Sequence, residues 1–93
     1  MVWTVRADRD GNVGEPVVVA HQLSTAIITR VQSGSWLRFY REPERVETEV
    51  IARDAEHAIA VIRRRCEFAR QHRLWGRTIG KPPRGYPTKA EEL

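Results

Sequence analysis

The chain has 93 residues, a formal net charge of +4 at pH 7 and a single cysteine. This length suits one small domain with one hydrophobic core, and a single cysteine excludes an intramolecular disulfide. No apolar run approaches the roughly 18 residues that a membrane span needs, and the N-terminus lacks the basic and apolar segments of a signal peptide. We therefore expect a cytoplasmic protein that does not contact membranes.

The positive charge is concentrated in the C-terminal part of the chain. Residues 1–53 hold seven arginines and seven acidic residues, whereas residues 54–93 hold nine basic and five acidic ones. All nine of those basic residues lie between Arg63 and Lys89, and only Glu67 opposes them within that stretch. This asymmetry predicts a basic end on the folded molecule.

The N-terminal segment has the pattern of a β-hairpin. Residues 1–8 alternate between apolar and polar side chains, with Trp3, Val5 and Ala7 on one face, which is typical of a half-buried strand. The turn-forming residues of the stretch 10–16 follow, and then a second apolar run, 17–20. We predict two paired strands joined by a loose loop.

Residues 23–31 have an ambiguous pattern. The four-residue spacing of Leu23, Ile27 and Val31 suits a short helix that ends at Gly34. The β-branched residues of the segment favour a strand instead, and we predict a strand.

The segments 36–41 and 46–52 have the pattern of a strand pair joined by a short loop. In the predicted register Leu37 lies opposite Val50, and Arg38 lies opposite Glu49 on the other face. Together with the earlier strands, this pair predicts a four- or five-stranded, mainly antiparallel meander.

The longest helical pattern runs from Asp54 to Trp75. Asp54 is the predicted N-cap, and Gly76 is the predicted stop signal. The apolar positions on one helix face are Ala55, Ala58, Ile59, Ile62, Cys66 and Ala69. Their spacing of three or four residues predicts that this face packs across the sheet.

These elements together predict an α+β fold with one long helix on one face of the sheet. Residues 1–75 form the predicted domain. The glycines and prolines of residues 76–93 exclude a long regular element, so we predict an extended basic arm there.

A second apolar line runs along the helix beside the core face. Val61, Phe68 and Trp75 recur every seven residues, about 100 to 140° from the core line. They either widen the buried face or form a surface for a protein partner or a second copy of the chain. Both interpretations stay open on the sequence alone, and the second makes these three the candidate protein-interaction residues.

The basic end of the helix and the arm form a candidate surface for a nucleic acid backbone. A helix end that continues into a flexible basic segment is a recurrent way to hold phosphates. The candidate residues are Arg64, Arg70, Arg73, Arg77, Lys81 and Arg84.

Catalytic and metal-binding patterns are missing from the sequence. His21, His57, His72 and Cys66 lack the paired spacings of metal ligands, and no nucleophile motif surrounds the serines. We expect no enzyme activity, metal, cofactor or small-molecule substrate. The sequence therefore predicts a non-catalytic protein-interaction module, such as a subunit, adaptor or inhibitor, with nucleic-acid binding as the alternative function.

Overall fold

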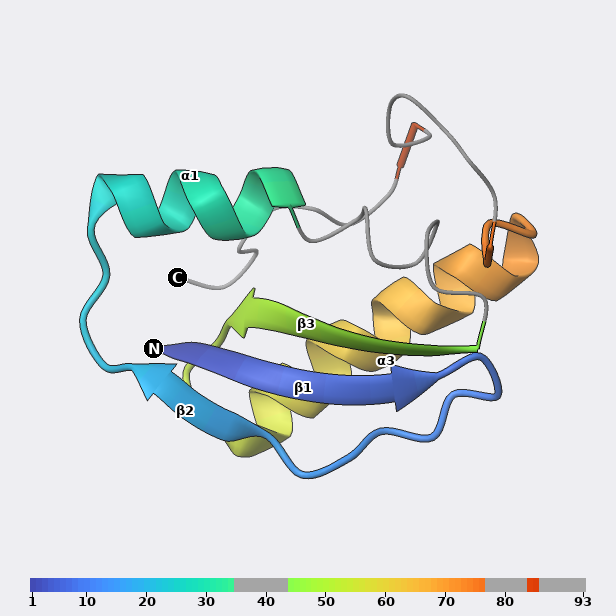
Figure 1. Ribbon diagram of the computed structural model, residues 1–93, viewed down its shortest axis with the longest axis horizontal. Coiled ribbons are helices and arrows are strands. Elements are labelled where there is room, and N and C mark those ends of the chain that lie inside the picture. The colour runs from blue at the N-terminus through green and yellow to red at the C-terminus, as the bar shows by residue number, and fades with distance from the viewer. Residues whose placement is uncertain (35–43, 77–83, 86–93) are drawn as a thin grey trace.

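The computed structural model describes residues 1–34, 44–76 and 84–85 of the chain. These residues form an α+β fold with a three-stranded antiparallel sheet and two helices (Figure 1). In chain order the elements are β1 (Val2–Asp8), β2 (Val17–Ala20), α1 (Thr25–Gly34), β3 (Arg45–Ile51) and α3 (Ala55–Gln71).

The strands are arranged in the order β2-β1-β3, so β1 is central. It pairs with β3 over its whole length, with Trp3 opposite Val50 and Val5 opposite Thr48. The predicted meander is therefore not the order of the described strands, because α1 carries the chain from β2 to the far side of β1. The predicted strand 36–41 lies outside the described residues, and so do the pairs that it was expected to make.

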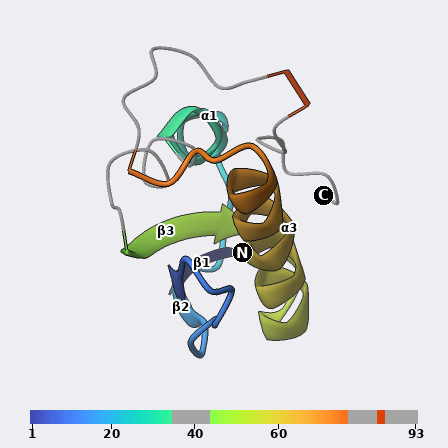
Figure 2. The ribbon, with the colours of Figure 1, turned by 90° about the vertical axis from the view of Figure 1, so that its right-hand side faces the viewer.

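The two faces of the sheet pack against different helices. Side chains alternate along β1, so Trp3 joins the cluster that contacts α3 whereas its neighbour Val2 joins the cluster around α1. Figure 2 shows α3 lying along one side of the strands and α1 lying apart from it. Polar pairs complete the α1 face. Arg6 Nε donates to Glu47 at 2.8 Å, and Arg30 of α1 pairs with Glu49 of β3.

The prediction of a strand over residues 23–31 is wrong, because α1 occupies this segment. Ser24 caps the helix by accepting a hydrogen bond from the backbone N–H of Ile27 at 3.2 Å. The four-residue stripe of Leu23, Ile27 and Val31 then faces Val2 and its neighbours. The helical spacing of the apolar residues therefore predicts this segment better than the β-branched residues do. β-Branched residues disfavour a helix by less than about 1 kcal/mol per residue.

A helix, α3, occupies most of the segment predicted as the long helix, but it is shorter than predicted and is one of two helices in the described residues. Asp54 is the N-cap, and its carboxylate accepts a hydrogen bond from the His57 N–H at 2.8 Å. The predicted core line faces the sheet, with Ile62 and Cys66 among its fully buried members. The helix ends at Gln71, several residues before the predicted stop at Gly76.

The predictions about membranes and about the C-terminal arm are tested only on the described residues. Neither α1 nor α3, the helices of the described residues, is long and apolar enough to cross a membrane. Of the predicted arm, only residues 76 and 84–85 are described. A Cβ built on Gly85 would lie 3.7 Å from the Phe68 ring, so this part of the arm runs beside α3.

Candidate nucleic-acid interface

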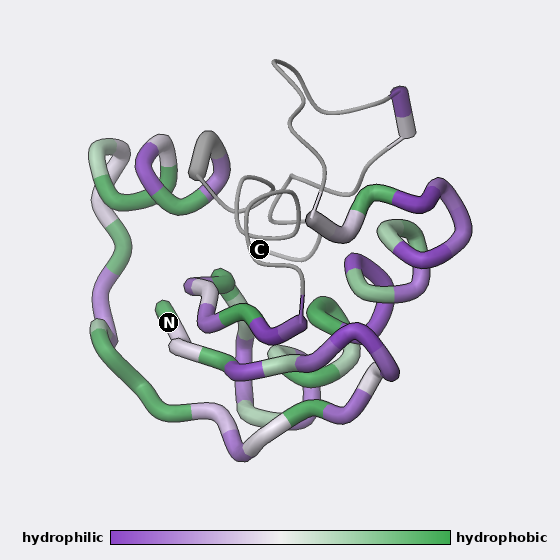
Figure 3. Tube along the Cα trace, turned by 45° about the vertical axis from the view of Figure 1, so that its right-hand side comes forward, coloured by the Kyte–Doolittle hydropathy of each residue, from purple (hydrophilic) through white to green (hydrophobic). Residues whose placement is uncertain are grey.

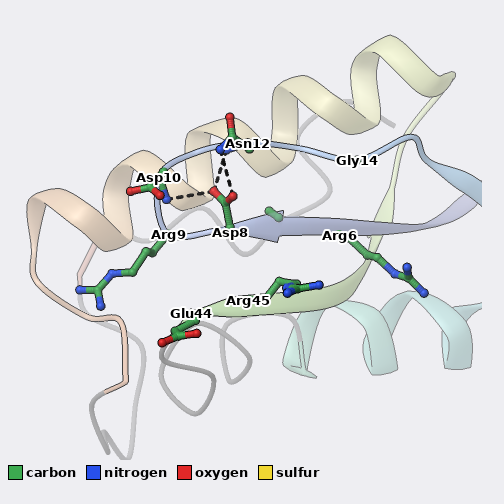
Figure 4. A pocket seen from close by; sticks show the side chains of 9 residues that line it. Arg6, Asp8, Arg9, Asp10, Asn12, Gly14, Glu44 and Arg45 are labelled. Atoms are coloured by element: carbon green, nitrogen blue, oxygen red, sulfur yellow. Dashed lines mark hydrogen bonds between the residues drawn. The ribbon is translucent and has the colours of Figure 1, made fainter.

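The loop between β1 and β2 is held by one carboxylate. Asp8 accepts hydrogen bonds from the backbone N–H groups of Asp10 and Asn12, at 3.0 and 2.9 Å, and from the Asn12 side-chain amide at 3.0 Å (Figure 4). The Asn12 side-chain bond is the main reason that the pKa of Asp8 lies below its ordinary value. Gly11 has a φ of 90°, a conformation that favours glycine. The loop therefore has a defined shape.

This loop is anchored to both neighbouring elements. The Arg9 N–H donates to the Glu44 carbonyl at 3.0 Å, next to the start of β3. The Arg70 guanidinium donates to the Asp10 carbonyl at 3.0 Å, a contact between residues sixty positions apart. A Cβ on Gly11 would lie 3.3 Å from Arg70 Nη1, so the loop and α3 approach closely here. These contacts bring Arg9 to the C-terminal end of α3.

The chain leaves α3 through a turn that fixes the next basic residue. Arg73 has a φ of 54°, in the left-handed region. Its N–H bonds the Arg70 carbonyl at 3.1 Å, and the Leu74 N–H bonds the Ala69 carbonyl at 2.8 Å. This pattern is a Schellman motif, in which the buried Leu74 supplies the apolar contact. The backbone of Arg73 is thereby fixed even though its side chain is exposed.

Three arginines meet at this end of the molecule, and we name Arg9, Arg70 and Arg73 the basic corner. Together with Asp10 and Trp75 they line one open hollow. The three arginines are exposed, and among the described residues that line this hollow Asp10 is the only acidic one. Figure 3 shows hydrophilic residues in both the loop after β1 and the last turn of α3. The corner therefore carries an excess of positive charge.

A neighbouring hollow at the end of β1 differs from the basic corner in its charge. Arg6, Arg9 and Arg45 line it, but so do three carboxylates, those of Asp8, Asp10 and Glu44 (Figure 4). The charges balance, and the Asp8 carboxylate is engaged by the loop. In Figure 4 the Arg9 side chain extends away from Asp8. This hollow is therefore less suited to an anion than the basic corner.

The predicted nucleic-acid-binding residues do not form one cluster. Arg70 and Arg73 lie together in the basic corner. Arg64 is exposed and lines a different hollow, which Phe68 and Gly85 also line. Arg84 is exposed, whereas Arg77 and Lys81 lie outside the described residues. Arg9 was not among the predicted residues, because its charge is balanced by acidic neighbours along the chain and only the fold brings it to α3.

The predicted protein-interaction line lies mostly in the core. Val61 is 3 % exposed and Trp75 is 9 % exposed, and both belong to the cluster between α3 and the sheet. This burial agrees with the alternative interpretation, a wide buried face. Phe68 is half-buried, and its ring stacks on His72 with 3.9 Å between the ring centroids. Of the three, Phe68 alone has appreciable exposure in the single chain.

Two further groups on α3 are buried in structural positions. Arg65, the third residue of the arginine triplet, is 3 % exposed, whereas Arg63 and Arg64 are exposed. Burial raises the pKa of the Cys66 thiol to about 11. That pKa keeps the thiol protonated at neutral pH and makes it a poor nucleophile. Within the described ranges, no three His, Cys, Asp or Glu side chains gather as metal ligands.

Comparisons with protein-family models, curated proteins and solved structures found no match to this chain.

Proposed function

We propose that this protein binds the phosphate backbone of a nucleic acid through the basic corner. The observation that supports it best is the meeting of Arg9 with Arg70 and Arg73 around one hollow. Guanidinium groups suit this task because each can donate two parallel hydrogen bonds to a phosphate. The fixed backbone at Arg9 and Arg73 limits the entropy that is lost on binding.

We expect other arginines to extend this surface. Arg63 and Arg64 are exposed on α3, the helix that carries Arg70, and Arg84 is exposed in the segment that follows α3. Phosphate contacts carry no sequence information by themselves, so we expect binding that depends weakly on base sequence and strongly on salt.

The test measures binding of fluorescently labelled duplex and single-stranded DNA and RNA by anisotropy. Three neutralised phosphates predict that duplex DNA affinity falls roughly 40-fold between about 50 and 200 mM salt. Arg9→Glu and Arg73→Glu should each weaken binding at least about tenfold, since each replaces an attraction with a repulsion. Arg70→Glu also removes the hydrogen bond to the Asp10 carbonyl that holds the loop, so its loss of affinity would combine two effects.

The matched control is Arg53→Glu, which makes the same charge change at an exposed position before the start of α3. The 17 residues of α3 separate it from the corner by about 25 Å. Arg53→Glu should leave affinity within about threefold of the original. Absence of binding at low salt, or equal losses for Arg53→Glu and Arg9→Glu, would contradict the proposal.

A protein-interaction function is the second candidate, and the exposure of Phe68 favours it. The Phe68 ring lines a hollow with Arg64, Glu67, Gln71 and Gly85. An apolar side chain surrounded by polar ones is typical of a protein interface. Phe68→Asp should abolish self-association or partner capture without unfolding the domain, as judged by circular dichroism and by sedimentation. A protein whose association state and partner capture are unaffected by Phe68→Asp does not use this surface.

A further inference from the structure

The basic corner contains a carboxylate that phosphate binding alone does not explain. Asp10 is exposed and lines the same hollow as Arg9, Arg70 and Arg73. A carboxylate anion repels a phosphate, and both groups only accept hydrogen bonds, so they cannot bond to each other. Asp10 therefore weakens the hold of the corner on phosphate unless its carboxylate binds another part of the ligand.

The backbone of Asp10 fixes its position in the hollow. Its N–H donates to the Asp8 carboxylate at 3.0 Å, and its carbonyl accepts from the Arg70 guanidinium at 3.0 Å. Among the described residues no donor bonds to the Asp10 carboxylate, which points away from Asp8 in Figure 4. This acceptor is therefore held in place beside the arginines and is available to a ligand.

A nucleic acid offers one hydrogen-bond donor directly beside its phosphates, the 2′-hydroxyl of ribose. DNA lacks this group, and the amino groups of the bases are attached further from the phosphate. The hollow has a volume of about 490 Å³, within the roughly 300–1,000 Å³ of typical ligand sites, so a sugar fits in it together with a phosphate. Because Arg9 and Asp10 are adjacent in the chain, a phosphate on Arg9 brings its sugar close to the carboxylate.

We propose that the basic corner binds RNA in preference to DNA, with the Asp10 carboxylate accepting a hydrogen bond from a ribose 2′-hydroxyl while the arginines hold the adjoining phosphate. The hydrogen bond to RNA offsets the repulsion between carboxylate and phosphate, whereas DNA leaves that repulsion uncompensated. Asp10 acts in this way only if the arginines bind phosphate, so the inference rests on the proposed function.

The test compares oligouridine with its 2′-deoxy and 2′-O-methyl counterparts, each carrying a fluorescent label, by anisotropy at about 50 mM salt. The bases are identical in the three oligonucleotides, so donors on the bases do not contribute to the difference. The 2′-O-methyl form keeps the 2′-oxygen but cannot donate. Oligouridine should bind about tenfold more tightly than either counterpart, the effect of one hydrogen bond to a charged group.

Asp10→Ala removes the carboxylate and keeps the two backbone hydrogen bonds of this residue. The preference for oligouridine should fall to less than about twofold, and affinity for the 2′-deoxy form should rise because the repulsion is lost. A purely structural role would weaken all three oligonucleotides equally. The matched control, Glu56→Ala, removes an exposed carboxylate from the first turn of α3, about 20 Å along the helix from Arg70. It should keep the full preference, and circular dichroism checks that both variants fold.

The possible failures of the two proposals are distinguishable. Equal affinities of the original chain for the three oligonucleotides, with binding that Arg9→Glu and Arg73→Glu still weaken, overturn the role of Asp10 and leave phosphate binding standing. A preference for oligouridine that Asp10→Ala leaves unchanged also overturns that role. Absence of binding to all three oligonucleotides at low salt overturns both proposals.

Discussion

The sheet contacts α3 on one face and α1 on the other, and among the described residues the two contacts differ in size. The described residues of the α3 face belong to a cluster of thirteen buried residues that extends from Trp3 to Trp75. Those of the α1 face include three buried residues, Val2, Val31 and Ile51, with half-buried residues around them. Because apolar burial stabilises by roughly 25 cal/mol per Å², the described residues of the α3 face contribute more folding free energy than those of the α1 face.

The end of α3 belongs to both the core and the proposed binding surface. The last turns of α3 and the turn that follows bury Cys66, Ala69 and Leu74 while exposing Arg70 and Arg73. The basic corner therefore lies on the most strongly packed part of the molecule, where its arginines are well positioned. α1 rests on a small contact and is expected to open locally before the domain unfolds.

The largest expected effect on stability comes from replacing a core isoleucine by alanine, once on α3 and once on α1. Ile62 is fully buried on α3, whereas Ile28 on α1 is half-buried. Ile62→Ala should lower the free energy of unfolding by about 2–5 kcal/mol, and Ile28→Ala by about 1 kcal/mol or less. Urea denaturation followed by circular dichroism measures both values. Equal losses of unfolding free energy for Ile62→Ala and Ile28→Ala would contradict the inference that the α3 contact contributes more to stability than the α1 contact.

A pH titration should give the next largest effect on the α3 face. Burial raises the Cys66 thiol pKa from 9.0 to about 11, so the unfolded chain loses this proton at a lower pH than the native chain. The contribution of Cys66 to the free energy of unfolding should therefore be constant below about pH 9 and fall between about pH 9 and 11, by about 3 kcal/mol in total.

The control for this titration is Cys66→Ala, which lacks the thiol. Its free energy of unfolding should be lower at neutral pH, because the side chain is smaller. The difference in stability between wild type and variant should shrink as the pH rises above 9. A constant difference across this range would show that Cys66 is more hydrated than its burial implies.

The smallest expected effect compares the two helix caps. Asp54 caps α3 and Ser24 caps α1, each by accepting a hydrogen bond from the third helical N–H. Asp54→Ala should lower global stability by about 1 kcal/mol. Ser24→Ala should act mainly on local opening, speeding amide exchange in α1 while shifting the denaturation midpoint less. A global loss from Ser24→Ala as large as that from Asp54→Ala would show that α1 unfolds together with the sheet.

Sequence patterns predicted the elements with strong periodicity. The alternation in residues 1–8 predicted β1, and the core line of α3 with its Asp54 cap was confirmed. The α1 segment was assigned to a strand because single-residue propensity was weighted above the spacing of Leu23, Ile27 and Val31. Propensity differences are small, and burial against Val2 and Ile51 outweighs them.

The candidate site was predicted only in part, for a related reason. Arg70 and Arg73 were found because a run of positive charge is visible along the chain. Arg9 was missed because Asp8 and Asp10 neutralise it locally, and its approach to α3 depends on a hydrogen bond between Arg70 and the Asp10 carbonyl.

The sequence by itself determined which segments of this protein are periodic enough to be strands or helices, and that the basic charge gathers near the end of α3. The tertiary structure decided the strand order, the second helix, the burial of Val61 and Trp75, and the position of Arg9. The physical reason is that periodicity and capping act over a few residues, whereas strand order and the meeting of distant charges depend on contacts between residues far apart in the chain.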